Sequence, residues 1–396
     1  MKTLSDFNFK DQVALIRVDF NVPMNEAQQV TDTNRITAAK PTIDAVLAQG
    51  GKAVLMSHFG RPKGQVNPSM SLSLIVEAVS EVLGVPVAFS EDCVGDKAQA
   101  AIAALAPGGV LLLENLRFHS EEEAGDEAFA KQLASLGDIY VNDAFGTAHR
   151  AHASTTIIAQ YFKGACCFGA LLAKEILAID KVMSSGEKPV TAILGGSKVS
   201  SKITIIERLL DKVDNLIVGG GMAYTFVKAT GGQVGNSLVE DDFLETAKVI
   251  IEKAKNKGVN LYIPVDTVVA DKFDNDANRK TVAINEIPNG WMGLDVGPLT
   301  IENCKEIIEN SKLILWNGPM GVFEMENFQA GTKSVADAIV IATKKGAFSL
   351  IGGGDSVAAI NKFKYANEVS YVSTGGGAML EYLEGIELPG IKAIID

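Results

Sequence analysis

Four arginines in the first half of the chain have the residue type and placement expected of an anion site. They are Arg35, Arg61, Arg117 and Arg150, and each lies in a short polar motif near the end of an apolar run or in a loop. A guanidinium group donates hydrogen bonds in pairs, which suits carboxylates and phosphates. Four such groups repel one another unless an anion or acidic side chains neutralise them. Ordinary salt bridges are the alternative for each arginine alone, but the four together favour a polyanion site.

Other polar residues stand in the same motifs. Asp19 and Asn21 belong to RVDFNVP, and His58 precedes Arg61 by three residues in SHFGRP. His58 has the side chain of a base, a phosphate donor or an ordinary loop residue, and its spacing from Arg61 allows joint contact with one anion. Arg17 lies inside an apolar run, so for this residue we expect a structural ion pair.

The second half of the chain offers glycines and lysines instead. In GGSKVSSKI, Gly195 and Gly196 indicate a tight turn, and Lys198 and Lys202 stand four residues apart. If a helix covers 199–212, this spacing places both ammonium groups on one face of its first turns. A helix N-terminus attracts anions through its free N–H groups and its dipole. Two solvated lysines are the alternative.

Three further glycine turns follow apolar runs in the second half, in GGGMA (219–223), GGGDS (352–356) and TGGGA (374–378). One such turn is a weak indication, but three in one domain favour a phosphate or nucleotide site. Asp355 could cap a helix or hold Mg²⁺ against phosphate oxygens, and the sequence leaves both open. The chain has neither GxxxxGK[ST] nor GxGxxG.

Arginines in one half and glycine turns with two lysines in the other suit phosphoryl transfer between a nucleotide and a small anionic acceptor. Such chemistry depends on positioning and charge stabilisation more than on a nucleophile. A two-domain dehydrogenase would carry a dinucleotide fingerprint, and a non-catalytic anion-binding protein would normally carry an export signal. Neither feature occurs in the sequence.

The elements that must position these residues alternate along the chain. Continuous apolar runs of this length are typical of parallel strands buried on both faces, and helical periodicity fills the intervals. The alternation predicts α/β architecture with doubly wound parallel sheets, and a helix at 170–189 marks the break between two domains. The strand runs are 13–21, 52–60, 110–118, 138–146, 190–196, 215–221, 261–270, 312–321, 347–354 and 370–377; the helical stretches include 72–83, 127–136, 199–212, 240–256 and 331–345.

The composition also bears on partners and cellular location. The net charge is −12, which makes nucleic acid an unexpected partner. No apolar run approaches 18 residues, and the N-terminus lacks the apolar core of an export signal, so we expect no membrane association. Four cysteines without a CxxC pair suit a reducing compartment, and we expect a cytoplasmic protein.

The motifs RVDFNVP, SHFGRP, ENLRF, NDAFGTAHRAHAS, GGSKVSSKI, LWNGPMGVFE, GGGDS and STGGGA occur in this order. With them the sequence resembles the phosphoglycerate kinase family of the bacterial type over its whole length. The resemblance implies two Rossmann-like domains joined by a helix, in a monomer that closes by hinge bending. It implies an acid-binding domain at 1–170, an interdomain helix and hinge at 171–189, a nucleotide-binding domain at 190–377 and a return of about 378–396 to the first domain.

The resemblance also implies roles for individual residues. Arg35 would lie nearest the moving phosphoryl group, Glu324 would face the ribose, and Asp355 would hold Mg²⁺. The 3-phosphoglycerate site would comprise Asp19, Phe20, Asn21, Arg35, His58, Phe59, Gly60, Arg61, Arg117 and Arg150. The nucleotide site would comprise Lys198, Lys202, Gly219, Gly220, Gly293, Asn317, Glu324, Gly353, Gly354, Asp355 and Ser356, and the catalytic set would be Arg35, Lys198, Gly375 and Gly376.

The activity implied is reversible phosphoryl transfer between ATP and 3-phosphoglycerate in glycolysis, direct and in line, without a phosphoenzyme. The acceptor carboxylate, with a pKa near ~4, needs no general base. The departures from the family pattern are small: Ser197 and Ser356 stand where alanine and threonine are commoner, and His119 stands where tyrosine is common.

Overall fold

A computed structural model describes residues 1–395, and the chain divides into two compact units. The first unit comprises Met1–Leu177 together with the residues from Ile386 onward, and the second comprises Ala178–Gly385. Each unit is built on a parallel sheet of six strands. The predicted doubly wound α/β class is therefore confirmed for both units.

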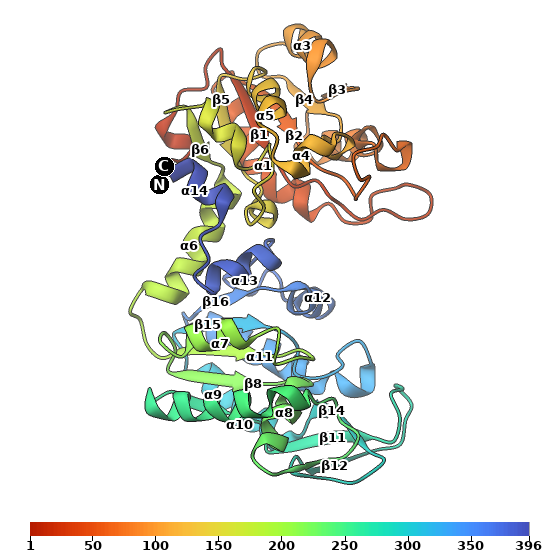
Figure 1. Cartoon of the computed structure of the whole chain (residues 1–396), viewed down its shortest axis with the longest axis vertical. Coiled ribbons are helices and arrows are strands. Elements are labelled where there is room, and N and C mark those ends of the chain that lie inside the picture. The colour runs from red at the N-terminus through yellow and green to blue at the C-terminus, as the bar shows by residue number, and fades with distance from the viewer. Residues whose placement is uncertain (396) are drawn as a thin grey trace. The chain divides into compact units, whose positions relative to one another are not determined.

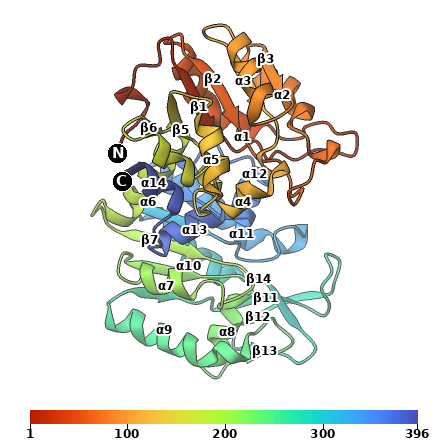
Figure 2. The same cartoon turned by 45° about the horizontal axis from the view of Figure 1, so that its top comes forward.

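The sheet of the first unit has the order β3-β4-β2-β1-β5-β6, with every pair parallel. Its central strands are apolar over most of their length because helices lie on both faces of the sheet, as Figures 1 and 2 show. The strands are β1 Val13–Arg17, β2 Lys52–Met56, β3 Val87–Ser90, β4 Val110–Leu113, β5 Ile139–Asn142 and β6 Cys166–Phe168. The helices are α1 Asn34–Leu47, α2 Val76–Leu83, α3 Gly95–Ala104, α4 Ser120–Ala124, α5 Glu127–Ala134, α6 Ala170–Ser184, which continues into the second unit, and α14 Pro389–Ile395.

The two ends of the chain lie side by side in the first unit (Figures 1 and 2). Thr3 forms a parallel bridge with Phe168, and the Gly390 N–H donates to the Ala148 carbonyl at 2.8 Å. The return begins at Ile386, later than the expected 378, because α13 (Gly377–Leu383) packs on α7 of the second unit. The other boundary, after Leu177, lies inside α6 (Ala170–Ser184) and within the range 171–189 given to the interdomain helix and hinge.

The sheet of the second unit has the order β10-β8-β7-β15-β16-β17, again with every pair parallel. Trp316 and its neighbours on β15 form the centre of the core beneath α10 and α11. The strands are β7 Val190–Leu194, β8 Asn215–Val218, β10 Asn260–Tyr262, β15 Leu313–Asn317, β16 Phe348–Ile351 and β17 Tyr371–Val372. The helices besides α13 are α7 Ile203–Leu209, α8 Met222–Ala229, α9 Leu244–Asn256, α10 Pro298–Glu309, α11 Ala330–Lys344 and α12 Gly354–Lys362.

The second unit also contains strands that the sequence patterns did not reveal. An antiparallel sheet has the order β12-β11-β14, and β13 pairs with β9. The apolar run 261–270 was expected to be one strand, which is wrong: it forms β10 and then β11 in a different sheet. Pro264 lies between them and has no N–H to continue a ladder. The added strands are β9 Gln233–Val234, β11 Asp266–Ala270, β12 Arg279–Ala283, β13 Glu286–Ile287 and β14 Met292–Val296.

The helix expected over 199–212 begins later than the periodicity suggested. Helix α7 starts at Ile203, Lys202 is its N-cap, and Lys198 lies in the irregular segment before it. Two serines hold this segment out of the helix: the Ser200 N–H and hydroxyl both donate to the Glu240 carboxylate, and the Ser201 hydroxyl donates to the Lys198 carbonyl at 2.9 Å. Such bonds compete with helical ones. The expected placement of both lysines on one helix face is therefore wrong.

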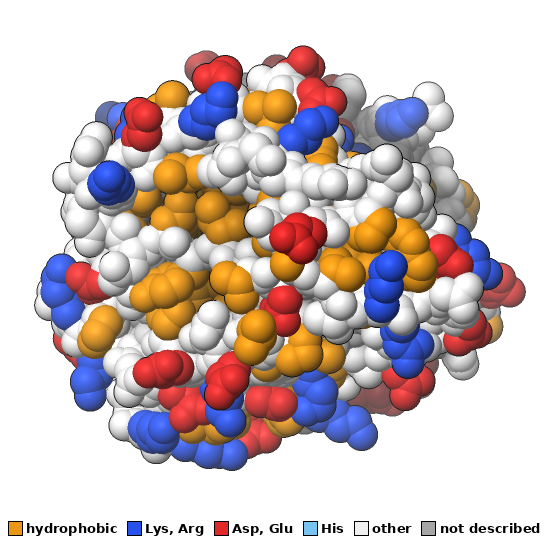
Figure 3. All heavy atoms as spheres, turned by 90° about the horizontal axis from the view of Figure 1, so that it is seen from below, with side chains coloured by type: hydrophobic (Ala, Val, Ile, Leu, Met, Phe, Trp, Pro, Cys, Tyr) orange, Lys and Arg blue, Asp and Glu red, His pale blue; other side chains and the backbone are white. Residues whose placement is uncertain are grey.

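The surface of the second unit mixes charges of both signs. On the face drawn in Figure 3, lysine and arginine side chains alternate with aspartate and glutamate side chains around apolar patches. Exposed ion pairs in this unit include Lys253 with Glu207 and Lys257 with Asp211. Pairs of this kind usually contribute less than ~1 kcal/mol each. Within residues 1–395, no helix combines the length and apolar content needed to cross a bilayer.

A buried aspartate anchors the start of α10. The Asp266 carboxylate accepts hydrogen bonds from the Leu299 N–H and the Thr300 N–H, both at 2.9 Å, and from the Thr300 hydroxyl at 2.7 Å. The first N–H groups of a helix have no partner within the helix, so this carboxylate supplies one from β11. It thereby joins the antiparallel sheet to the helix.

We expect Asp266→Ala to lower the free energy of unfolding by about 2 kcal/mol, because the N–H groups of Leu299 and Thr300 lose the carboxylate that accepts from them. Urea denaturation of the whole chain measures the change. Glu302→Ala, on the exposed side of the same helix, is the matched control and should change stability by less than about 0.5 kcal/mol. Equal losses in the two variants would contradict the anchoring role.

Candidate active site

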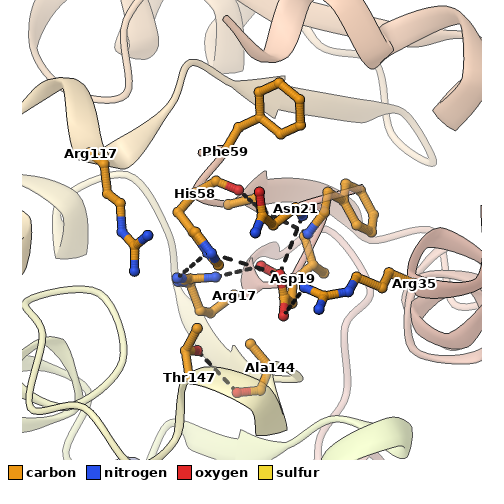
Figure 4. Close-up of polar contacts among 12 residues, drawn as sticks. Arg17, Asp19, Asn21, Arg35, His58, Phe59, Arg117, Ala144 and Thr147 are labelled. Atoms are coloured by element: carbon orange, nitrogen blue, oxygen red, sulfur yellow. Dashed lines mark hydrogen bonds and ion pairs between the residues drawn. The ribbon is translucent and has the colours of Figure 1, made fainter. Parts of the chain in front are cut away.

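The carboxyl ends of β1 and β2 bring Asp19, Arg35 and His58 together. These strands are parallel neighbours, so the residues that follow them emerge at one edge of the sheet. The Asp19 carboxylate lies 2.7 Å from Arg35 NH1 and 3.9 Å from His58 Nδ1. Burial raises the pKa of Asp19, but the nearby His58, Arg35 and Arg17 outweigh it and hold the pKa below its usual value. Figure 4 shows this cluster with Arg17 beneath His58.

His58 is a neutral imidazole in this environment. Burial lowers its pKa to about 3, with Arg17, Arg117 and Arg35 acting in the same direction and Asp19 against them. A protonated ring would add a charge to an already cationic region. His58 is therefore suited to donate a hydrogen bond to an anion without ionising, and unsuited to act as a base near neutral pH.

The other expected arginines lie in the same electropositive region. Arg117 NH1 donates to the Gly60 carbonyl at 3.0 Å, and burial, Arg17 and Arg61 lower its pKa against the attraction of Glu123. Arg150 is exposed and, with Arg117 and Arg17, lowers the pKa of His152. The positive charges of these arginines thus lower the pKa values of neighbouring cationic groups. An electropositive region of this kind attracts anions.

The aromatic and amide residues of these motifs build the frame of the site. Phe20 and Phe59 are buried in the core, so their side chains do not face an anion. The Asn21 side-chain Oδ1 accepts the Gly60 N–H at 2.9 Å, which fixes the loop after β2. Asn115, which sequence reasoning missed, is fully buried and bonds both the N–H and the carbonyl of Phe59. Its place beside Arg117 in ENLRF was the only indication available.

In the second unit, a cavity of about 520 Å³ lies among the glycine turns. Its wall is largely apolar and carries carboxylates from Glu324 and Asp355, which suits a flat base joined to a polar group. Gly293 can only be glycine, because a side chain there would overlap the ring of Tyr224. The residues around the cavity include Gly196, Ser197, Gly220, Gly221, Tyr224, Leu238, Met292, Gly293, Leu294, Pro319, Val322, Glu324 and Asp355.

Several of the glycines bring backbone against backbone. A Cβ on Gly195 or Gly318 would overlap the main chain of the other turn, and one on Gly220 would meet Gly196. These residues let the turns after β7, β8 and β15 pack together. Gly219 is buried against the side chain of Met320. The main contribution of these glycines to a nucleotide site is therefore to let the turns that form it pack closely together.

Lys202 and Asn317 form the polar side of the site. The Lys202 ammonium donates to the Asn317 side-chain oxygen, and the Asn317 amide donates to the Gly352 carbonyl at 2.8 Å. Gly353 has φ +91°, and a Cβ there would lie 2.5 Å from the Asn317 nitrogen, so glycine is required. Burial lowers the pKa of Lys202, against the attraction of Asp355 and Glu384. Lys198 is exposed.

Asp355 and Ser356 have different roles from each other. Helix α12 begins after Gly353 without a side-chain cap, so the alternative in which Asp355 caps this helix is wrong. The Asp355 carboxylate is exposed and lines the cavity, as a Mg²⁺ ligand that shares the ion with phosphates would. Ser356 is fully buried, and its hydroxyl accepts the Gly318 N–H at 2.5 Å. Gly354 is exposed at the start of the helix.

The last glycine turn precedes α13. Gly375 is buried and its N–H donates to the Ser373 hydroxyl at 3.1 Å, so this amide already has a partner. Gly376 occupies the N-cap with φ +46°. Of the two glycines predicted to be catalytic, Gly376 thus has the conformation that only glycine adopts easily.

Comparison with known proteins accords with this geometry. The phosphoglycerate kinase family profile matches residues 4–386. Phosphoglycerate kinase from Porphyromonas gingivalis is 54% identical, with 99% of each chain covered, and that from Synechococcus elongatus is 53% identical, with 100% of this chain and 98% of the other covered. The solved structure of phosphoglycerate kinase from Coxiella burnetii has a TM-score of 0.91 at 41% identity and covers 99% of this chain and 98% of its own. On these grounds the chain belongs to the phosphoglycerate kinase family.

Proposed function

We propose that the chain catalyses reversible phosphoryl transfer between ATP and the carboxylate of 3-phosphoglycerate, giving ADP and 1,3-bisphosphoglycerate, in glycolysis. The observation that carries the proposal is the pairing of two different anion sites in one chain. In the first unit Arg35 pairs with Asp19 beside a neutral His58, and in the second unit Asp355 lines an apolar cavity and attracts Lys202. The names of the relatives support the same reaction.

The chemistry follows from charge. The acceptor is a carboxylate with a pKa near ~4, so it is ionised and needs no base. The neutral His58 then serves as a hydrogen-bond donor. The obstacle is repulsion between the acceptor and the nucleotide phosphates, which Arg35, Lys198 and Lys202 would offset. Mg²⁺ held by Asp355 would supply further positive charge to the phosphate oxygens.

We propose direct, in-line transfer without a phosphoenzyme. The two substrates bind to different units, and transfer requires the reacting atoms to approach within about 3–3.5 Å. Closure of the units, with α6 as the connecting helix, would bring the substrates together and exclude the water that hydrolyses an acyl phosphate. Gly376 would then present its amide to the transferred group.

We further propose that the chain acts in the cytoplasm as a monomer on small-molecule substrates, without nucleic acid or membrane. Its four cysteines are all free and buried, which suits a reducing compartment. Adjacent Cys166 and Cys167 have pKa values raised by burial, so they remain thiols that pack with apolar neighbours.

A coupled assay tests the proposal directly. The complete chain with 3-phosphoglycerate, ATP and Mg²⁺ should consume ATP, and omission of any one component should abolish the rate. An assay in which omission of 3-phosphoglycerate leaves the rate unchanged would overturn the proposed acceptor. Stabilisation against heat by NADH but not by ATP would instead favour a dehydrogenase.

Arg35→Ala should lower kcat on the order of 10³-fold, because the transferred group would lose a guanidinium that no neighbour replaces. Arg279→Ala, on the exposed strand β12, is the matched control and should leave kcat unchanged. Steady-state kinetics with both substrates saturating measures the effect. A loss of less than tenfold in the Arg35 variant would exclude contact with the moving group.

Lys202→Met should weaken ATP binding roughly 10- to 100-fold, because a charged hydrogen bond to phosphate is lost from a half-buried position. The affinity for 3-phosphoglycerate should not change, since that site lies in the other unit. Isothermal titration with each ligand measures both affinities, with the exposed Lys212→Met as control. Unchanged ATP affinity would place Lys202 outside the nucleotide site.

A further inference from the structure

Two opposite charges lie fully buried beside the acid site, and the reaction as described uses neither. Arg17 and Glu122 have no exposed surface, and they come from β1 and α4. Burying two ions costs several kcal/mol each unless their geometry and hydrogen bonds compensate. Arg17 and Glu122 are buried despite this unfavourable free energy and lie next to residues of the acid site. This combination indicates a role for them beyond packing.

Ser154 joins the two charges. Its hydroxyl donates to Glu122 Oε1 at 2.6 Å, and its N–H donates to Glu122 Oε2 at 2.9 Å. Because the hydroxyl proton is given to the carboxylate, the Ser154 oxygen is free to accept from Arg17 Nε at 2.8 Å. The direction of every bond is therefore fixed, from guanidinium to hydroxyl to carboxylate. Ser154 is itself fully buried.

The opposite side of the guanidinium group reaches His58. Arg17 NH1 donates to the Val18 carbonyl at 2.5 Å, and NH2 lies 3.3 Å from His58 Nδ1. A guanidinium has donors only, so Nδ1 must accept. The proton of the neutral ring then sits on Nε2. Figure 4 shows this contact; the Asp19 carboxylate lies near the same nitrogen but at 3.9 Å, beyond hydrogen-bond distance.

Glu122 supplies the negative charge that neutralises Arg17 on the Ser154 side of the guanidinium group. Burial raises the pKa of Glu122, and Arg17, the Ser154 bonds and Arg117 counteract this. His152 Nδ1 lies 4.0 Å from Glu122 Oε1, and Asp19 attracts Arg17 from the substrate side. Without the Glu122 charge, Arg17 would be drawn toward Asp19, which is the partner of Arg35.

We infer that Glu122 and Ser154 are positioning residues for the acid site: they hold Arg17 so that its NH2 group fixes His58 as the Nε2–H tautomer. This inference rests on the proposed function, because it assigns the Nε2–H group to an oxyanion of the acid. Neither residue contacts the substrate. They act through Arg17 by setting which ring nitrogen carries the proton.

Heteronuclear NMR of nitrogen-labelled histidine in the complete chain tests the inference. The signal of His58, assigned by its loss in His58→Gln, should show the Nε2–H tautomer in the parent protein. Glu122→Gln and Ser154→Ala should populate the Nδ1–H form and lower kcat/KM for 3-phosphoglycerate by roughly 10-fold or more, with KM for ATP unchanged. Ser154→Thr keeps the hydroxyl and should restore both readouts.

Glu121→Gln, an exposed neighbour on α4, is the matched control and should alter neither readout. An Nδ1–H tautomer in the parent protein would overturn the inference, as would an unchanged tautomer in a folded Glu122→Gln or Ser154→Ala variant. A loss of thermal stability alone would show that the array is only structural. The NMR result does not depend on turnover, so a parent protein without kinase activity would refute the proposed function and leave the tautomer test intact.

Discussion

Repulsion between like charges is the constraint on which the first unit depends. Arg35, in the first turn of α1, pairs with Asp19, while Arg17 and Arg61 add to burial in lowering the pKa of Arg117, and Arg150 acts in the same direction on His152. Before an anion binds, Asp19 and Glu122 supply the balancing negative charge, one at the surface of the site and one fully buried. A histidine in this field stays neutral because a further cation would be unfavourable.

The second unit is subject to a different constraint, since main-chain turns lie against one another beside its largely apolar cavity. The turns after β7, β8 and β15 approach so closely that glycine is required where they meet. Polar side chains then stabilise these turns by hydrogen bonds. The Ser356 hydroxyl accepts the Gly318 N–H, and Asn317 accepts from Lys202 and donates to the Gly352 carbonyl in the turn after β16. Asp355 and Glu324 remain exposed at the cavity. Few side chains are thus available to bind a ligand at the cavity, and many other residues, which do not face the ligand, hold them in place.

Predictions from the sequence succeeded where a pattern is local. Buried parallel strands appear as apolar runs, and the residues at their carboxyl ends follow directly, so the pattern placed Asp19 after β1 and His58 after β2. They failed where a distant partner decides the outcome. Glu240 binds Ser200 and keeps the segment with Lys198 out of α7, and the run 261–270 is divided between two sheets because β10 pairs with β8 whereas β11 pairs with β12 and β14. The sequence also did not reveal that Ser356 accepts the Gly318 N–H, because the two residues lie 38 positions apart.

The sequence by itself determined the two α/β units, the family, and the residue types at each site, because these depend on periodicity and on motifs of adjacent residues. Only the tertiary structure decided which nitrogen of His58 faces Arg17, that Asp355 does not cap its helix, and that Ser154 links Arg17 to Glu122. Those outcomes depend on contacts between residues such as Arg17 and Ser154, which are 137 positions apart. Burial and hydrogen-bond direction exist only once the chain has folded, so no local pattern encodes them.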